Sequence, residues 1–136
     1  MKHSPIRVLV VDDTKYLTKL YAGIIESLGG YVAQVVTCSS EAIRVFGEAL
    51  KSSQRFDVVI IDLTLEEEIS TNGLDVLRKL RAIDPSIKAV ATSGYINREG
   101  ECFRFDISEF DGRLPKPIYS DDLSTVLKQV LLIHVA

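Results

Sequence analysis

Apolar residues along the chain gather in short runs that alternate with helical patterns. Nearly continuous apolar β-forming residues occupy positions 6–11 and 56–62, and weaker runs occupy positions 31–37, 87–91 and 112–115. Continuous runs of this length are typical of strands buried on both faces, as in the middle of a parallel sheet. The run at 31–37 is less apolar, so we expect that strand nearer an edge of the sheet. Five strands are therefore predicted.

Between these runs, apolar side chains recur three or four residues apart. The spacing predicts helices over residues 17–28, 39–50, 73–83 and 120–131. Residues 97–111 carry Gly100 and only a weak apolar pattern, so we expect a short or poorly formed helix there. Strands that alternate with helices, joined by right-handed crossovers, form a parallel sheet with helices on both faces. The predicted fold is a doubly wound, five-stranded α/β domain.

Composition narrows the possible functions of the protein. The 136 residues, 46% hydrophobic and 26% charged, are typical of one globular domain. A net charge of −3, with scattered Lys and Arg, argues against binding nucleic acid. Cys38 and Cys102 lack metal-type spacing and suit reduced thiols. The first apolar run is too short for a signal peptide or a membrane span, so we expect a soluble, cytoplasmic protein without membrane contact.

Polar residues follow the predicted strands at their carboxyl ends. Asp12 and Asp13 end the first strand, Asp62 the third, Ser93 the fourth and Lys116 the fifth. Each alone has a simpler explanation, such as a helix cap, a turn residue or a solvated charge. Because the carboxyl ends of parallel strands share one edge of the sheet, their joint occurrence favours a common site.

Three carboxylates at one edge repel each other. At ~5 Å and an effective dielectric of ~20, each pair costs about 3 kcal/mol. Such a cluster either raises a pKa or holds a cation. Since its ligands are hard oxygens, without a His or Cys, the cation predicted is Mg²⁺, for which Mn²⁺ can substitute. A carboxylate, Mg²⁺ and a lysine together suit phosphoryl transfer.

Four motifs carry a family resemblance over nearly the whole chain. They resemble, in order, those of the receiver domain of two-component response regulators, including receivers attached to hybrid sensor histidine kinases. The resemblance implies a flavodoxin-like three-layer fold, a single receiver domain over residues 1–136, and no enzyme activity beyond its own phosphorylation and dephosphorylation. The motifs are Val10-Val11-Asp12-Asp13, Ile60-Ile61-Asp62, Ala91-Thr92-Ser93-Gly94-Tyr95 and Leu114-Pro115-Lys116-Pro117.

The resemblance also implies a role for each site residue. Asp62 matches the phosphoacceptor, which takes its phosphoryl group from a sensor histidine kinase or a histidine phosphotransfer protein. Asp13 matches the direct Mg²⁺ ligand, Asp12 the acid that holds the ion through water, and the main-chain carbonyl of Thr64 a third ligand.

The remaining two strand ends match groups that contact the phosphoryl oxygens. Ser93 matches the switch hydroxyl, with Thr92 as its rival, and Lys116 matches the ammonium, whose bond to Pro117 is commonly cis in the family. A downstream partner, not identified by the sequence, is expected to bind the face formed by the helix within residues 97–111, the strand at 112–115 and the last helix.

The chain departs from the family pattern in three places, and the first two departures motivate an alternative. The loop at 65–72 is long, carries Glu66–Glu68 and lacks the usual Pro; Arg113 replaces the switch aromatic; and Gly94 follows Ser93, where Tyr95 offers another readout. The alternative is an interaction module that works without phosphorylation. A third possibility, a phosphatase with an aspartate nucleophile, ranks last because such enzymes place an Asp where this chain has Thr64.

Overall fold

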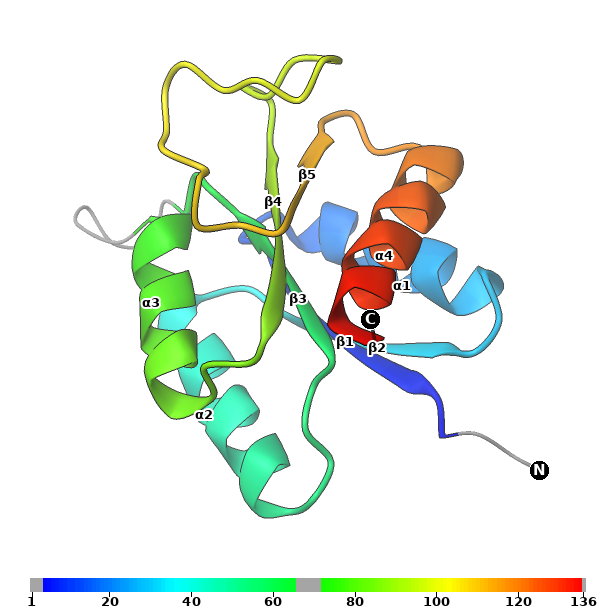
Figure 1. Ribbon diagram of the computed structural model, residues 1–136, viewed down its shortest axis with the longest axis vertical. Coiled ribbons are helices and arrows are strands. Elements are labelled where there is room, and N and C mark those ends of the chain that lie inside the picture. The colour runs from blue at the N-terminus through cyan, green and yellow to red at the C-terminus, as the bar shows by residue number, and fades with distance from the viewer. Residues whose placement is uncertain (1–3, 66–71, 136) are drawn as a thin grey trace.

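The computed structural model describes residues 4–65 and 72–135, which form five strands and four helices, with a helix between successive strands except the last two (Figure 1). The predicted strands and four of the predicted helices form within a few residues of their expected bounds. The elements are β1 (Ile6–Val11), α1 (Lys15–Ser27), β2 (Tyr31–Val36), α2 (Ser39–Lys51), β3 (Val58–Asp62), α3 (Gly73–Ile83), β4 (Lys88–Ser93), β5 (Gly112–Pro115) and α4 (Ser120–Val135).

All five strands are parallel and follow the order β2-β1-β3-β4-β5. The doubly wound fold is therefore confirmed, with β2 at an edge as its weaker apolar pattern predicts. Every residue of the central strand β3 is buried, which explains why its sequence is apolar without alternation. In the described part of the chain, no helix combines the length and the apolarity needed to cross a membrane.

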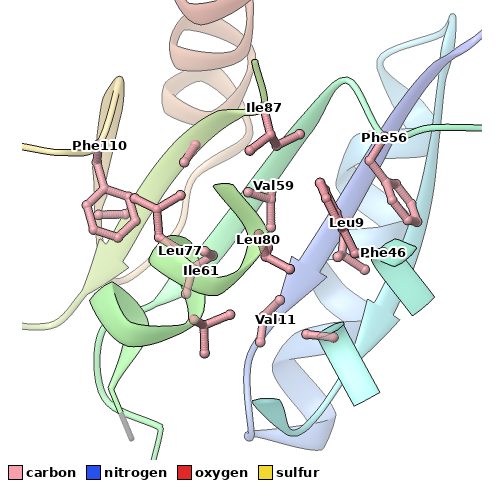
Figure 2. Packing of buried hydrophobic residues seen from close by; sticks show 14 of the residues in the cluster. Leu9, Val11, Phe46, Phe56, Val59, Ile61, Leu77, Leu80, Ile87 and Phe110 are labelled. Atoms are coloured by element: carbon pink, nitrogen blue, oxygen red, sulfur yellow. The ribbon is translucent and has the colours of Figure 1, made fainter. Parts of the chain in front are cut away.

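The sheet separates two hydrophobic cores, because successive side chains of a strand point to opposite faces. One core lies between the sheet and helices α2 and α3, where Leu77 and Leu80 pack against Val59 and Ile61 (Figure 2). The other lies under α1 and α4 and contains Val8, Val10, Val58, Ile60 and Leu127. Each fully buried side chain of this size contributes roughly 1.5–3 kcal/mol. Packing in the two cores holds the strands in register, so that their carboxyl ends lie at one edge of the sheet.

The prediction of a short or poorly formed helix within residues 97–111 is wrong. Between β4 and β5 the chain forms turns and one isolated antiparallel bridge, Ile96 with Cys102 (yellow in Figure 1). Gly100, at a φ of +82°, breaks any helical run there, and the Asn97 side chain accepts from the Glu101 N–H instead. The face predicted to bind a downstream partner thus consists of a loop, β5 and α4.

The first residue of helix α3, Gly73, packs directly against the end of β3. Asn72 caps the helix, since its side chain accepts from the Asp75 N–H while the Asp75 side chain accepts from the Asn72 N–H. At Gly73, an added Cβ would lie 2.6 Å from the Asp62 carbonyl oxygen and 2.9 Å from the Leu63 Cα. Only glycine permits this approach of helix to strand.

We therefore expect Gly73→Ala to lower the free energy of unfolding by about 1–3 kcal/mol, the usual cost of overpacking. Urea denaturation measures the change. Gly23→Ala is the matched control, because an added Cβ on that exposed residue of α1 meets nothing within 4 Å. The control should gain up to about 1 kcal/mol from helix propensity, and equal effects of both variants would contradict the packing argument.

Candidate functional site

A pocket of about 440 Å³ opens at the carboxyl edge of the sheet. Its lining comes from the ends of β1, β3, β4 and β5 and from the residues that follow them. Chain segments more than a hundred residues apart thus meet in one place, as the strand-end pattern predicts. The lining residues are Asp13, Thr14, Asp62, Thr64, Gly94 and Lys116.

The three predicted carboxylates come together at this edge. Asp12 and Asp62 are buried, Asp13 is half-buried, and each offers an oxygen within 4.8 Å of the others. Two backbone N–H groups orient the buried pair: Thr14 donates to Asp12 Oδ1 and Thr64 donates to Asp62 Oδ1, both at 2.9 Å. Each carboxylate therefore caps the turn that leaves its own strand.

Lys116 joins two of the carboxylates. Its Nζ lies 3.1 Å from Asp12 Oδ2 and 3.1 Å from Asp62 Oδ2. The Lys116-Pro117 peptide bond is cis. The backbone N–H of Lys116 donates to the Ser93 carbonyl at 3.1 Å. The end of β5 is thereby tied to the end of β4.

Burial and neighbouring charges shift the pKa values of two groups in the pocket. Burial raises the pKa of Asp62 above its ordinary value, although the Thr64 N–H and the Lys116 ammonium oppose that rise. Burial alone would lower the pKa of Lys116, but the carboxylates of Asp62 and Asp12 outweigh it and raise that pKa. Within the described residues, the Lys116 ammonium contacts two of the three carboxylates, those of Asp12 and Asp62. This set of hard oxygen ligands fits a divalent cation, which would offset negative charge of the carboxylates.

The two rival hydroxyls at the end of β4 have different partners. Ser93 is buried, and its Oγ accepts from the Tyr95 N–H at 2.9 Å. Thr92 is also buried, and its Oγ1 accepts from the Tyr21 hydroxyl at 3.4 Å. Successive side chains of a strand point to opposite faces of the sheet, so the Thr92 and Ser93 side chains lie on different faces. Tyr21 is a polar contact near the site that the sequence patterns do not reveal, because it occupies an apolar helix position.

The departures from the family pattern have local structural consequences. Arg113 is exposed, and its Nη1 donates to the Gly100 carbonyl at 3.1 Å, so it ties β5 to the preceding loop. The Tyr95 side chain is 51% exposed, with the Arg104 guanidinium 4.5 Å from its ring centre. Glu66–Glu68 lie outside the described residues. The Thr64 carbonyl as a metal ligand, like the roles of the other site residues, stays a prediction.

Comparison with known proteins identifies relatives of the chain. A family model for the response regulator receiver domain matches residues 8–128. The chemotaxis protein CheY of Thermotoga maritima is 34% identical over 87 residues, which are 64% of this chain and 66% of that protein. The sensor histidine kinase AtsR of Burkholderia thailandensis is 28% identical over 130 residues, which are 94% of this chain and 20% of the kinase.

A comparison with solved structures also finds receiver domains. A CheY-like response regulator receiver domain from Methylobacillus flagellatus matches with a TM-score of 0.73 and 27% identity, covering 93% of this chain and 99% of that one. The sequence matches span just under two thirds of the chemotaxis protein and one fifth of the kinase.

The raised pKa of Asp62 predicts that Asp62→Asn increases the free energy of unfolding when chelator removes divalent cations. The folded state binds a proton at Asp62 more tightly than the unfolded chain does, so the ionised carboxylate destabilises the fold. This penalty is fully present above the raised pKa and disappears as pH falls toward the ordinary value of 3.8. Urea denaturation from neutral to acidic pH should therefore show a gain that shrinks with acidity.

Asp106→Asn is the control of opposite sign. The N–H of Ser108 lowers the pKa of Asp106, so that exposed carboxylate stabilises the fold at neutral pH and ceases to do so in acid. A stability gain of the Asp62 variant that does not change with pH would contradict the electrostatic account.

Proposed function

Because this chain belongs to the response regulator receiver domain family, we propose that it relays signals by accepting a phosphoryl group on Asp62. Receiver domains are signalling modules that work with histidine kinases or histidine phosphotransfer proteins. The donor proposed here is accordingly the phosphohistidine of such a partner. One observation carries the assignment: Asp62 is the buried carboxylate that contacts Lys116 while lining an open pocket with Asp13.

The arrangement suits an in-line transfer. An oxygen of Asp62 forms the new bond to phosphorus as the bond from phosphorus to the donor imidazole nitrogen breaks. Asp12, Asp13 and Asp62, with the Thr64 carbonyl, would hold Mg²⁺, which when bound offsets charge on the phosphoryl oxygens. Lys116 supplies a second positive charge, already placed 3.1 Å from Asp62 Oδ2. Ser93 turns its hydroxyl from the Tyr95 N–H toward a phosphoryl oxygen.

The output proposed for this switch passes through the loop at residues 94–111, β5 and α4. Movement of Ser93 displaces the loop that begins at Gly94. Two arginines carry this displacement further, since Arg113 binds the Gly100 carbonyl and Arg98 pairs with Asp122 of α4 at 3.2 Å. Couplings of this kind are typically about 1–3 kcal/mol, so the partner's affinity changes by a population shift.

The rest of the proposal concerns the chain as a whole. Residues 1–136 act as a single receiver domain that has no enzyme activity beyond its own phosphorylation and dephosphorylation. A cytoplasmic location suits the two free thiols, Cys38 and Cys102. The downstream partner is a protein rather than nucleic acid, because the net charge is −3.

A second candidate is a receiver that binds its partner without phosphorylation. The contact from Arg113 to Gly100 favours it, because an arginine hydrogen-bonded to the loop backbone replaces the aromatic ring that usually moves. Metal binding separates the two candidates, since a module that works without phosphorylation has no need of the cation.

We expect the protein to become phosphorylated when it is incubated with acetyl phosphate and Mg²⁺, and Asp62→Asn to abolish this. Phosphate-affinity electrophoresis and intact-protein mass spectrometry measure the product, a base-labile acyl phosphate. Asp57→Asn is the matched control, because Asp57 lies just before the same strand and accepts the Arg7 N–H, away from the pocket. Equal labelling of Asp62→Asn and the parent protein would refute the assignment.

Mg²⁺ should bind at millimolar concentration or below, and Asp13→Asn should weaken binding at least tenfold. A unit charge ~4 Å from the cation contributes several kcal/mol at an effective dielectric of ~20. Isothermal titration calorimetry measures the affinity. Asp106→Asn, a change at an exposed acid that belongs neither to the carboxylate cluster nor to the pocket lining, should leave it unchanged. Absence of binding by the parent protein would favour the phosphorylation-independent module.

A further inference from the structure

The loop at residues 94–111 begins with a residue that binds the Ser93 hydroxyl. The backbone N–H of Tyr95 donates to Ser93 Oγ at 2.9 Å. The ring of the same tyrosine contacts two side chains further along the loop. The Arg104 guanidinium lies 4.5 Å from the ring centre, and the Phe105 ring meets it edge to face at 6.0 Å between centroids. These two ring contacts form a clamp on Tyr95 that has no role in the mechanism above.

The far side of this clamp is anchored to the body of the domain. Phe105 packs against the core under α2 and α3, and Phe110, further along the loop, is buried in that core. On the other side of Arg104, Cys102 pairs with Ile96 in the isolated bridge. The backbone that carries Arg104 is therefore fixed on both sides, so its guanidinium restrains the tyrosine ring rather than moving freely with it.

In this arrangement the Ser93 hydroxyl lies outside the acceptor pocket. Among the described residues that line the pocket, Gly94 is present but Ser93 is not, and Ser93 is only 1% exposed. Its Oγ closes a turn of a kind that serine favours by accepting the Tyr95 N–H. To reach a phosphoryl oxygen on Asp62, the hydroxyl must leave this turn. Any contact that keeps the Tyr95 backbone in place therefore opposes the step proposed for Ser93.

The clamp and the turn favour the same position of the Tyr95 backbone. A contact that stabilises one position of a residue raises the population of every other contact made in that position. The ring contacts thus keep the Tyr95 N–H next to Ser93 Oγ. Because Tyr95 is 51% exposed, and a cation–π contact at an exposed site is weak, the clamp changes this population several-fold rather than absolutely.

We propose that Arg104 is a positioning residue for phosphoryl transfer, which clamps the Tyr95 ring and so keeps the Ser93 hydroxyl out of the acceptor pocket. The proposal rests on the functions proposed for Asp62 and Ser93 and adds a restraint to them. A phosphoryl group on Asp62 draws Ser93 out of its turn and thereby loosens the clamp. Because such coupling is reciprocal, a looser clamp makes the acceptor pocket bind a phosphoryl group more tightly.

The test measures the affinity for beryllofluoride, an analogue of a phosphoryl group on a carboxylate, by NMR titration in saturating Mg²⁺. Arg104→Met removes the guanidinium, and we expect the affinity to rise about two- to fivefold, the effect of a cation–π contact at an exposed site. Tyr95→Leu removes the ring, keeps the backbone N–H, and should raise the affinity at least as much. Arg44→Met is the matched control and should leave the affinity unchanged, because this exposed arginine pairs with Glu41 and Glu48 of its own helix.

The double variant Arg104→Met/Tyr95→Leu shows whether the arginine acts through the ring. If it does, the double variant binds beryllofluoride no more tightly than Tyr95→Leu, and a further gain overturns the proposal. An unchanged or lower affinity in Arg104→Met overturns it as well, since the loss of a positive charge alone would weaken the binding of an anion. An equal gain in Arg44→Met would overturn it because the effect would then not need the clamp.

A second readout does not depend on the acceptor. Solvent exchange of the Tyr95 amide proton, measured by NMR without metal or analogue, should be about two- to fivefold faster in Arg104→Met, because exchange requires the N–H to leave Ser93 Oγ. Unchanged exchange overturns the proposal even if the parent protein binds no beryllofluoride. Failure of the parent protein to bind beryllofluoride instead refutes the function proposed for Asp62, so the two failures are distinguishable.

Discussion

The contact of Lys116 with two buried carboxylates is the constraint on which the site depends. Its ammonium lies 3.1 Å from oxygens of both Asp12 and Asp62, which come from neighbouring strands of the sheet. Burying charges costs several kcal/mol per ion unless each has a partner, and a single lysine here serves two acids. The pairing is possible only because parallel strands end at one edge. A slip in the register of β1, β3 or β5 would leave a charge buried alone.

The same constraint explains why so much of the fold and site could be predicted from sequence. Strands β1 and β3 are buried on both faces, so their sequences stay apolar until the strand reaches the edge of the sheet. Asp12 and Asp62 are the acids at that edge. Because the two strands are parallel neighbours, the two acids lie close together. Lys116 was predictable for the same reason, since it follows directly after the last strand. The roles of these residues rest on the family rather than on their spacing.

Two features escaped prediction for different physical reasons. Residues 94–111 carry no periodicity strong enough to indicate a structure, and long-range ion pairs hold their end to the body of the domain. Arg81 of α3 lies 2.9 Å from Asp111, and Asp111 also accepts the Ala89 N–H. Tyr21 shows the opposite effect: its ring occupies a position in the apolar stripe of α1, so the sequence pattern gives no sign of a hydrogen bond from its hydroxyl. The partner of a buried hydroxyl depends on tertiary packing, which local patterns do not contain.

The end of β4 contacts the charged pocket, helix α1 and the loop at residues 94–111. Thr92 contacts α1 on one face of the sheet, while Ser93 binds the Tyr95 N–H at the start of the loop. The Ser93 carbonyl also accepts from Lys116, so one strand end touches the charged pocket, a helix and the loop. A change of charge at Asp62 therefore acts on a strand that is held from both sides. Since packed elements shift between discrete arrangements rather than bending freely, such a strand end transmits a local change to the surface.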